Sequence, residues 1–255
     1  MLYGLYLSAT GIMTNSYRQD VIANNLANSE TVGFKKDLAM FKQRPTAAQE
    51  NPQDGDATDK QMEALGGGTF AMPTRVDMTP GDMENTGGNM DAAIDGSGYF
   101  AVDDHGTQRL TRNGQFMIDR EGYLELSNGR GIKVLDPGGK PIKLDGTEAD
   151  VTTISQDGSI TQNDKPAGRI GVFDVDDVSK ISKVGGTLLS YPDMKSLKPS
   201  PSLLRNQFIE HANVDPATEM AALMETQRQL EANANMIRYQ DTTLGELVNT
   251  VGKIA

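Results

Sequence analysis

The chain has 255 residues, which is enough to bury a substantial core in one or two domains. It contains no cysteine, so disulfides, thiolate metal sites and a cysteine nucleophile are excluded. Its 35 acidic residues outnumber its 24 basic residues, and the formal net charge of -11 argues against binding to nucleic acid or to an anionic membrane surface.

The first predicted element is a helix over residues 2–28, followed by a polar run and by Gly33, which suits the positive φ found after helix ends. A stripe of apolar residues, with small or polar residues at some positions, recurs at spacings of three and four. The stripe residues are Leu2, Leu5, Ala9, Ile12, Ser16, Gln19, Ala23 and Leu26. Because no Lys or Arg precedes the apolar residues, we expect a mature helix and no cleaved signal peptide. No stretch approaches the ~18 apolar residues of a membrane span.

The middle of the chain changes character twice. The segment 34–43 is short and amphipathic, and the segment 44–68 is rich in Pro, Gln, Asp and Gly. Residues 34–68 are therefore predicted to form an extended linker. Between residues 69 and 190, turn pairs such as Asn113-Gly114 and Asp157-Gly158 separate short candidate strands, which indicates a β domain. The candidate strands are 99–102, 115–118, 123–126, 132–135, 142–144, 151–154 and 169–175.

A second long helix is predicted at the end of the chain, after a proline-containing return linker over residues 191–212. Asp215 is a good N-cap, Pro216 fits the first helical position, and Glu219 lies in the positive first turn. The helix is expected to continue to about residue 251 with a seam sustained over several heptads. The seam residues are Met220, Leu223, Gln227, Leu230, Ala234, Ile237, Asp241, Leu244, Val248 and Val251.

These elements predict an α+β fold. Residues 1–33 and 213–255 are expected to pair as a discontinuous, coiled-coil-like helical domain, with a central β-rich domain over residues 69–190. Four large apolar side chains of the first helix are worth ~1.5–3 kcal/mol each when buried, whereas ordering its backbone costs ~1–2 kcal/mol per residue. The isolated helix is therefore marginal, which favours packing against other copies. A purely intramolecular helix hairpin is the alternative.

Residues that could carry chemistry are sparse. His105 is predicted in a turn and His211 just before the last helix, so neither is assigned to a metal. The acidic run 174–179 has Ser179 where a calcium loop requires glycine. Gly96-Ser97-Gly98 is expected to be a tight turn, since it lacks both a third fingerprint glycine and the nucleophile-elbow spacing. We predict no catalytic, metal or cofactor site, and a secreted β-rich glycan-active enzyme or adhesin is the competing class.

The sequence resembles bacterial flagellar rod and hook proteins at several places along its length. The strongest likeness is the run from Asn24 to Lys35, Asn-Asn-Leu-Ala-Asn-Ser-Glu-Thr-Val-Gly-Phe-Lys. Further matching positions are residues 91–100, residues 111–116, Asp119, Gly122, Tyr123, Leu124, residues 213–215, Glu219, Met220, Gln227, Arg228, Glu231 and Asn233. Ala212, Leu230 and Leu110 depart from the residues usual in that family.

The resemblance implies a structural axial subunit that is not an enzyme. Such proteins self-assemble helically through their terminal helices, transmit torque and form part of the export channel wall. The implied partners are copies of the chain, other flagellar rod proteins and the flagellar type III export apparatus. The implied location is the periplasmic basal body of the flagellum, reached without a cleaved signal peptide. Within the family the sequence is more similar to a proximal rod protein, with a distal rod or hook-type subunit as the alternative.

The candidate site is accordingly an assembly interface rather than a cleft. It combines the helical seams with the asparagine-rich end of the first helix, which the resemblance implies is a packing joint. The predicted interface residues are Leu2, Leu5, Ile12, Asn24, Asn25, Leu26, Asn28, Gly33, Phe34, Met220, Leu223, Gln227, Leu230, Ile237, Leu244 and Val248.

Overall fold

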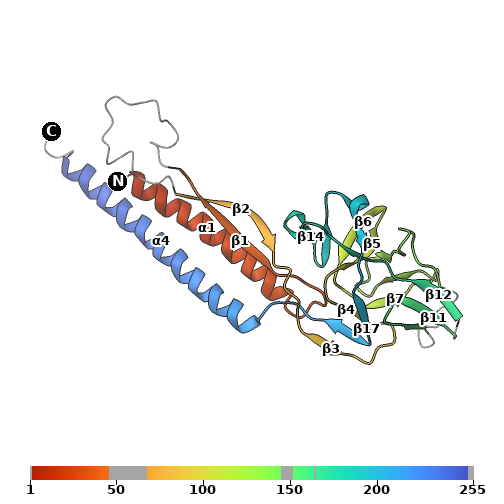
Figure 1. Cartoon of the computed structure of the whole chain (residues 1–255). Helices are drawn as coiled ribbons and strands as arrows, with labels where there is room; N and C mark the ends of the chain where they lie inside the picture. The colour runs from red at the N-terminus through yellow and green to blue at the C-terminus, as the bar shows by residue number, and fades with distance from the viewer. Residues whose placement is uncertain (1, 46–67, 145–151, 164, 252–255) are drawn as a thin grey trace. The chain divides into compact units, whose positions relative to one another are not determined.

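The computed structural model describes residues 2–45, 68–144, 152–163 and 165–251 (Figure 1). Most of the linker predicted over residues 34–68 lies outside these ranges. The helices are α1 (Leu2–Ala27) and α4 (Pro216–Val251), with short 3-10 turns η2 (Val178–Lys180) and η3 (Met194–Ser196). The strands are β1 (Asp37–Gln43), β2 (Thr69–Val76), β3 (Met83–Asn85), β4 (Ala92–Asp95), β5 (Tyr99–Asp104), β6 (Thr107–Thr111), β7 (Phe116–Ile118), β8 (Leu124–Leu126), β9 (Lys133–Val134), β10 (Thr152–Ile154), β11 (Ser159–Gln162), β12 (Lys165–Arg169), β13 (Val172–Asp174), β14 (Ser182–Gly185), β15 (Leu188–Ser190), β16 (Lys198–Pro199), β17 (Leu203–Asn206) and β18 (Phe208–Glu210).

The two long helices agree with the sequence. Helix α1 ends one residue before the predicted boundary, and α4 begins at Pro216 after the predicted N-cap. Gly33 has φ +70, as expected for a residue that redirects the chain after a helix. The fold class is therefore α+β. Neither helix is long and apolar enough, within the described residues, to cross a membrane.

The chain divides into two compact units. The first contains residues 1–26, 37–75 and 216–255, and the second contains residues 27–36 and 76–215. In the first unit α1 and α4 are accompanied by β1 and β2, which pair as a two-stranded sheet (Figure 1). The domains predicted from the sequence differ from these units, because residues 27–33 and 213–215 fall in the second unit. In addition, residues 37–43 of the predicted linker form a strand, and residues 69–75 of the predicted β domain pair with that strand.

The second unit is the β-rich region. Its largest sheet has nine strands, in which β14, β15, β6, β5, β9, β8 and β7 follow one another, and β13 pairs with both β5 and β16. Strands β10, β11 and β12 form a separate antiparallel sheet. Strand β17 pairs with β4, and β18 pairs with β3. The return linker predicted over residues 191–212 therefore differs from the structure, because its backbone groups complete sheets with strands from early in the unit.

The largest hydrophobic cluster of this unit draws on strands of several of these sheets. Phe100, Leu124, Leu126, Val134 and Ile160 are fully buried in it. The rings of Phe100 and Phe116 meet edge to face with their centroids 5.2 Å apart. Strand β5 contains the predicted strand 99–102, and β10 contains the described residues of the predicted strand 151–154, because apolar residues of both are buried in this core. Residue 151 lies outside the described residues. Residues 142–144 are not a regular strand, but Lys143 forms an isolated bridge with Tyr123, and Ile142 and Leu144 are buried as the pattern predicts.

Candidate assembly interface

Within the first unit, two glycines of α1 lie against side chains of α4. A Cβ atom added to Gly4 would lie 2.6 Å from Nε2 of Gln240. A Cβ atom added to Gly11 would lie 2.8 Å from Nδ2 of Asn233. Both distances are shorter than ordinary van der Waals contact, so the absence of a side chain on α1 permits these contacts.

The predicted seam residues of α4 separate into two groups. Leu223, Leu230, Ile237 and Leu244 are half-buried, one heptad apart. Met220, Gln227 and Val248 are exposed, and Val248 is 70% exposed. The subunit by itself therefore covers only part of the predicted seam.

The predicted residues of α1 also differ in burial. Leu2 begins the helix, and Leu5, Ile12 and Leu26 are half-buried. Further large apolar side chains of α1 point outward, among them Met13, which is 73% exposed.

Among the described residues, most exposed large apolar side chains lie in the first unit. Besides those already named they include Tyr6, Leu7, Leu38, Met40, Phe41, Phe70, Met72, Met224, Met236, Tyr239 and Leu247. Strands β1 and β2 contribute five of them. Contiguous exposed apolar surface on a folded protein commonly marks an interaction site. The helices and the two-stranded sheet therefore form the best candidate interface.

Hydrogen bonds hold the asparagine-rich end of α1 to neighbouring backbone. Asn25 is 2% exposed, and its side chain closes two hydrogen bonds with the backbone of Asp37. Its Nδ2 donates to the Asp37 carbonyl at 2.9 Å, and its Oδ1 accepts from the Asp37 N–H at 2.9 Å. Asn24 is exposed, and Asn28 accepts a hydrogen bond from the Thr31 N–H at 3.0 Å in the turn after the helix. Asn25 thus ties the end of α1 to the start of β1.

The second unit contains a buried charged cluster around Glu210, at the end of β18. The carboxylate accepts hydrogen bonds from Lys35 Nζ at 2.5 Å and from the Gly81 N–H at 3.0 Å. Its other oxygen lies 3.2 Å from Nη1 of Arg112. The side chains of Glu210, Lys35 and Arg112 are 0%, 2% and 8% exposed. Two cations therefore share one desolvated carboxylate.

Further contacts fix the two cations. Lys35 Nζ also donates to the Thr79 carbonyl at 2.7 Å. Arg112 Nη2 donates to the Gly96 carbonyl at 2.8 Å, and the guanidinium lies 5.3 Å from the centroid of the Tyr99 ring. The charged groups bond to one another inside the subunit, so removal of one of them would leave a buried charge without its partner.

Backbone bonds around this cluster join three segments of the chain. The Gly33 N–H donates to the Glu210 carbonyl at 2.7 Å, and the Asp77 N–H donates to the Lys36 carbonyl at 2.9 Å. The Asn213 side chain accepts from the Lys36 N–H at 2.8 Å and donates to the Asp77 carbonyl at 3.0 Å. Residues 33–36, 77–81 and 210–213 are thereby held together. We call Gly33, Phe34, Lys35, Arg112, Glu210 and Asn213 the junction cluster.

The two predicted interface residues in this cluster are buried within the subunit. A Cβ atom on Gly33 would lie 2.3 Å from the Asn113 backbone nitrogen, so the position requires glycine for space as well as for its positive φ. Phe34 is fully buried with Ala212 and Val214, and Lys183 Nζ lies 3.8 Å from its ring centroid.

The environment of the junction cluster shifts three pKa values. Burial lowers the pKa of Lys35, although the Glu210 carboxylate opposes this effect. Burial raises the pKa of the Tyr99 hydroxyl. Burial acts to raise the pKa of Asp77, but hydrogen bonds from Thr79 and the charges of Lys36 and Lys35 outweigh it, and the pKa is lowered.

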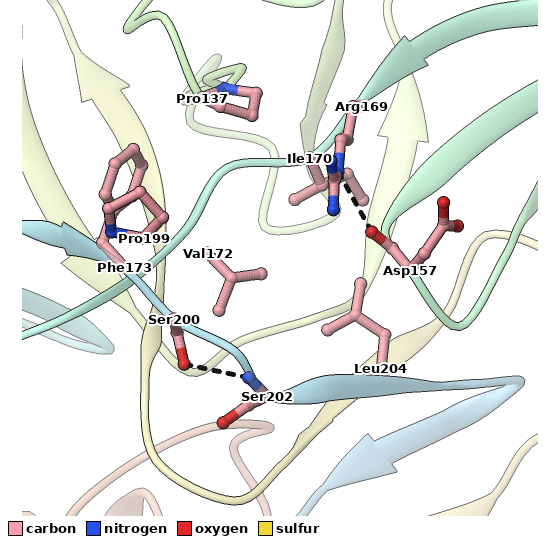
Figure 2. Close-up of a pocket in the computed structure, with 10 residues that line it drawn as sticks. All are labelled: Pro137, Asp157, Arg169, Ile170, Val172, Phe173, Pro199, Ser200, Ser202 and Leu204. Carbon is pink, nitrogen blue, oxygen red and sulfur yellow. Dashed lines mark hydrogen bonds between the residues drawn. The ribbon is translucent and has the colours of Figure 1, made fainter.

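The second unit also has a surface groove (Figure 2). Ile170 and Leu204, which line the groove, are buried core residues, and Val172 packs against the same core. Its polar groups bond to one another, since Arg169 Nε donates to the Asp157 carbonyl at 3.1 Å and the Ser202 N–H donates to Ser200 Oγ at 3.2 Å. The groove is lined by Pro137, Asp157, Arg169, Ile170, Val172, Phe173, Pro199, Ser200, Ser202 and Leu204.

The histidines, glycines and acidic residues that the sequence did not assign to a site lie in turns, helix caps and ion pairs. His105 lies in the turn between β5 and β6 with φ +50, and His211 contacts Glu84. Gly96 and Gly98 both have positive φ in the predicted tight turn. Asp177 caps η2 by accepting from the Ser179 N–H. No group of three or more metal-ligating side chains occurs among the described residues.

No pattern in the sequence marks Lys35, Arg112 or Glu210 as members of one cluster. Lys35 and Arg112 lie within stretches that carry the family resemblance, but a single cation gives no indication that it is buried. Glu210 lies in the segment 191–212, which the sequence predicts to be a linker. Only its pairing with β3 brings its carboxylate to the two cations.

Comparisons with known proteins match the same segments. Models of three families match: flagella basal body rod protein over residues 5–35, the D1 domain of flagellar hook protein FlgE/F/G over residues 93–162, and the C-terminal region of flagellar basal body rod FlgEFG protein over residues 205–250. The junction cluster draws on all three segments. Its charged members Lys35, Arg112 and Glu210 come from one segment each.

Full-length relatives agree. The chain is 34% identical to the flagellar basal-body rod protein FlgF of Caulobacter vibrioides, with 98% of each chain covered. It is 30% identical to FlgF of Mesorhizobium japonicum, with 97% of each covered, and 30% identical to the rod protein FlgG of Bacillus subtilis, with 98% of this chain and 99% of that one covered.

These matches identify the class as a structural protein and not an enzyme. The chain belongs to the flagellar basal-body rod protein family. Its place is therefore the flagellar basal body, and its partners are flagellar. The competing interpretation as a glycan-active enzyme or adhesin is not favoured.

Proposed function

We propose that this chain is a structural subunit of the flagellar basal-body rod that self-assembles helically through its terminal helices. In this proposal α1 and α4 pair as a discontinuous coiled-coil-like domain, and many such domains form the channel wall and transmit torque. The observation that carries the proposal is the concentration of exposed apolar side chains on the helices and on β1 and β2. Such a surface gains stability when neighbouring copies cover it.

The predicted interface residues have different roles in this proposal. Exposed side chains such as Met220 and Val248 would contact neighbouring subunits directly. Half-buried residues such as Leu230 and Ile237 would hold the two helices together and present their remaining surface to neighbours. Gly33 and Phe34, which are buried in the second unit, would contribute by keeping that unit folded.

The sharpest test is a charge at an exposed seam position. Val248→Asp should leave the subunit folded, because the side chain is 70% exposed, but should prevent incorporation into basal bodies and abolish motility. Asn249→Asp adds the same charge at the next, also exposed, position and serves as the matched control. Normal motility and incorporation of Val248→Asp would contradict the proposal.

We also propose a periplasmic location reached through the flagellar type III export apparatus, without a cleaved leader. The absence of cysteine suits a chain that is exported unfolded into an oxidising compartment. Mass spectrometry of the subunit from isolated basal bodies should recover a peptide beginning at Met1 or Leu2. A mature N-terminus further along the chain would refute this route. Within the rod, we propose a proximal position, which tagging of the subunit in electron microscopy of basal bodies would locate.

A further inference from the structure

The apolar residues of the helical unit do not by themselves fix how far one helix is shifted along the other. The half-buried apolar residues of α4 repeat every seven positions, as Leu223, Leu230, Ile237 and Leu244. A shift by seven residues would present a similar apolar side chain at each level. Another feature must therefore distinguish the correct offset.

Two glycine–amide contacts provide that distinction. Gly4 and Gly11 are seven residues apart on α1, and the residues they meet, Gln240 and Asn233, are seven residues apart on α4. Seven positions forward on one helix therefore correspond to seven positions back on the other. This is the relation required for two antiparallel helices in constant register.

Extended by another heptad, the same register would bring Arg18 of α1 opposite Thr226 of α4. Thr226 is 1% exposed, and its hydroxyl donates to the Ala222 carbonyl of its own helix at 2.8 Å. A long side chain on one helix would then lie opposite a short one or a glycine on the other at this level, as it does at the two glycine levels.

A shift in either direction disrupts this matching. Shifted one way, Arg18 would lie opposite Asn233 and Gly11 opposite Gln240. Shifted the other way, each glycine would lie opposite a shorter side chain, Asn233 or Thr226, and a void would open. Overpacking and voids both destabilise a close-packed interface.

We propose that the glycine–amide pairs Gly4–Gln240 and Gly11–Asn233 set the register of the two terminal helices within each subunit. This inference rests on the proposed function, because it specifies how the subunit presents its seam to its neighbours. The apolar rows then supply the affinity, and the glycine–amide pairs select a single offset, as polar seam residues do in coiled coils.

Disulfide trapping can test the register, since the chain has no cysteine of its own. Gly11→Cys is combined with Asn233→Cys, the register pair, or with Gln240→Cys, a control displaced by one heptad. Basal bodies isolated from cells carrying each pair are oxidised and run under denaturing conditions. The register pair should give about a tenfold greater yield of intrachain disulfide than the control, because a disulfide needs Cα atoms within about 7 Å.

Two results would overturn the proposal. One is equal linkage of the displaced pair, and the other is linkage of the register pair only between two chains. The second would place the register contacts between copies. Failure of the proposed function would look different, since the wild-type chain would then be missing from isolated basal bodies.

A size exchange gives a second test that does not require disulfide formation. Gly11→Leu should prevent incorporation into basal bodies, and adding Asn233→Ala should restore it by removing the opposing side chain. Gly245→Ala, at a helical glycine with no atom within 4 Å of an added Cβ, is the matched control and should incorporate normally. If Asn233→Ala gives no restoration, or if Gly11→Leu alone incorporates normally, the register assignment is wrong.

Discussion

Replacing Glu210 with glutamine should strongly destabilise the second unit. The substitution keeps the shape of the side chain but removes the only negative charge shared by Lys35 and Arg112 in the junction cluster. Both cations would remain in a site where their side chains are 2% and 8% exposed. Loss of one partner of a buried ion pair typically costs about 3–5 kcal/mol, so we expect a loss of that size in the free energy of unfolding at pH 7.

Amide hydrogen exchange of the purified full-length chain can measure this loss for the second unit alone. The amides of residues 100–102 in β5, which lie in the central sheet, report its opening free energy. The matched control is Asp95→Asn, which breaks an ion pair with Arg205 whose side chains are 49% and 51% exposed. An exposed pair of this kind contributes about 0–1 kcal/mol.

The pH dependence of the Glu210→Gln deficit tests whether the buried charge of Lys35 causes it. Burial already lowers the pKa of Lys35, and removal of the Glu210 charge would lower it further. A lysine whose pKa is lowered in the folded state destabilises the fold while it is charged. This destabilisation decreases as pH rises towards the pKa of the unfolded state, because the folded state releases its proton first. The deficit of Glu210→Gln should therefore shrink between pH 7 and pH 10. A loss no larger than that of Asp95→Asn, or one independent of pH, would refute the buried-charge explanation.

Three further substitutions test neighbouring features. Gly33→Ala should lower the free energy of unfolding by about 2–4 kcal/mol, because the φ of Gly33 is +70 and the new Cβ would lie 2.3 Å from the backbone nitrogen of Asn113. A loss below ~1 kcal/mol in chemical denaturation would contradict this. Asp77→Asn should lower the free energy of unfolding by about 1–2 kcal/mol at pH 7. Because the folded-state pKa of Asp77 is lowered, this difference from wild type should disappear as pH falls below the ordinary pKa of 3.8. A difference that persists unchanged in acid would exclude the ionised carboxylate as its cause. Asn25→Ala removes both hydrogen bonds to the Asp37 backbone and should increase amide exchange at residue 37, and unchanged exchange would show that these bonds contribute little.

Local signals in the sequence were sufficient to predict the helices. The cap formed by Asp215 and Pro216, together with the apolar spacing of α4, acts over a few residues and can be interpreted without knowledge of the rest of the chain. The same holds for Gly33, whose positive φ follows from its place after a helix. Strand content in the second unit was also predictable, because turn residues and apolar runs alternate there.

Pairings between distant segments could not be predicted in this way. Strand β17 pairs with β4 and β18 with β3, so segments more than a hundred residues apart complete one another. The return segment is short and contains several prolines, which is typical of a linker, and only its partners make it a strand. Glu210 illustrates the consequence, because its role depends on Lys35 and Arg112 and not on its own neighbours in the sequence.

The family segments and the exposed seam place different demands on the chain. The motif residues Asn25, Gly33 and Phe34 are buried within the subunit, whereas Met13 and Val248 project from it. Substitution of the first group should therefore lower the stability of the purified chain, and loss of assembly would follow from that. Substitution of the second group should block assembly while stability stays unchanged. Measuring both quantities for Phe34→Ala and Val248→Asp would separate these roles, and loss of stability in both variants, or in neither, would show that the division is wrong.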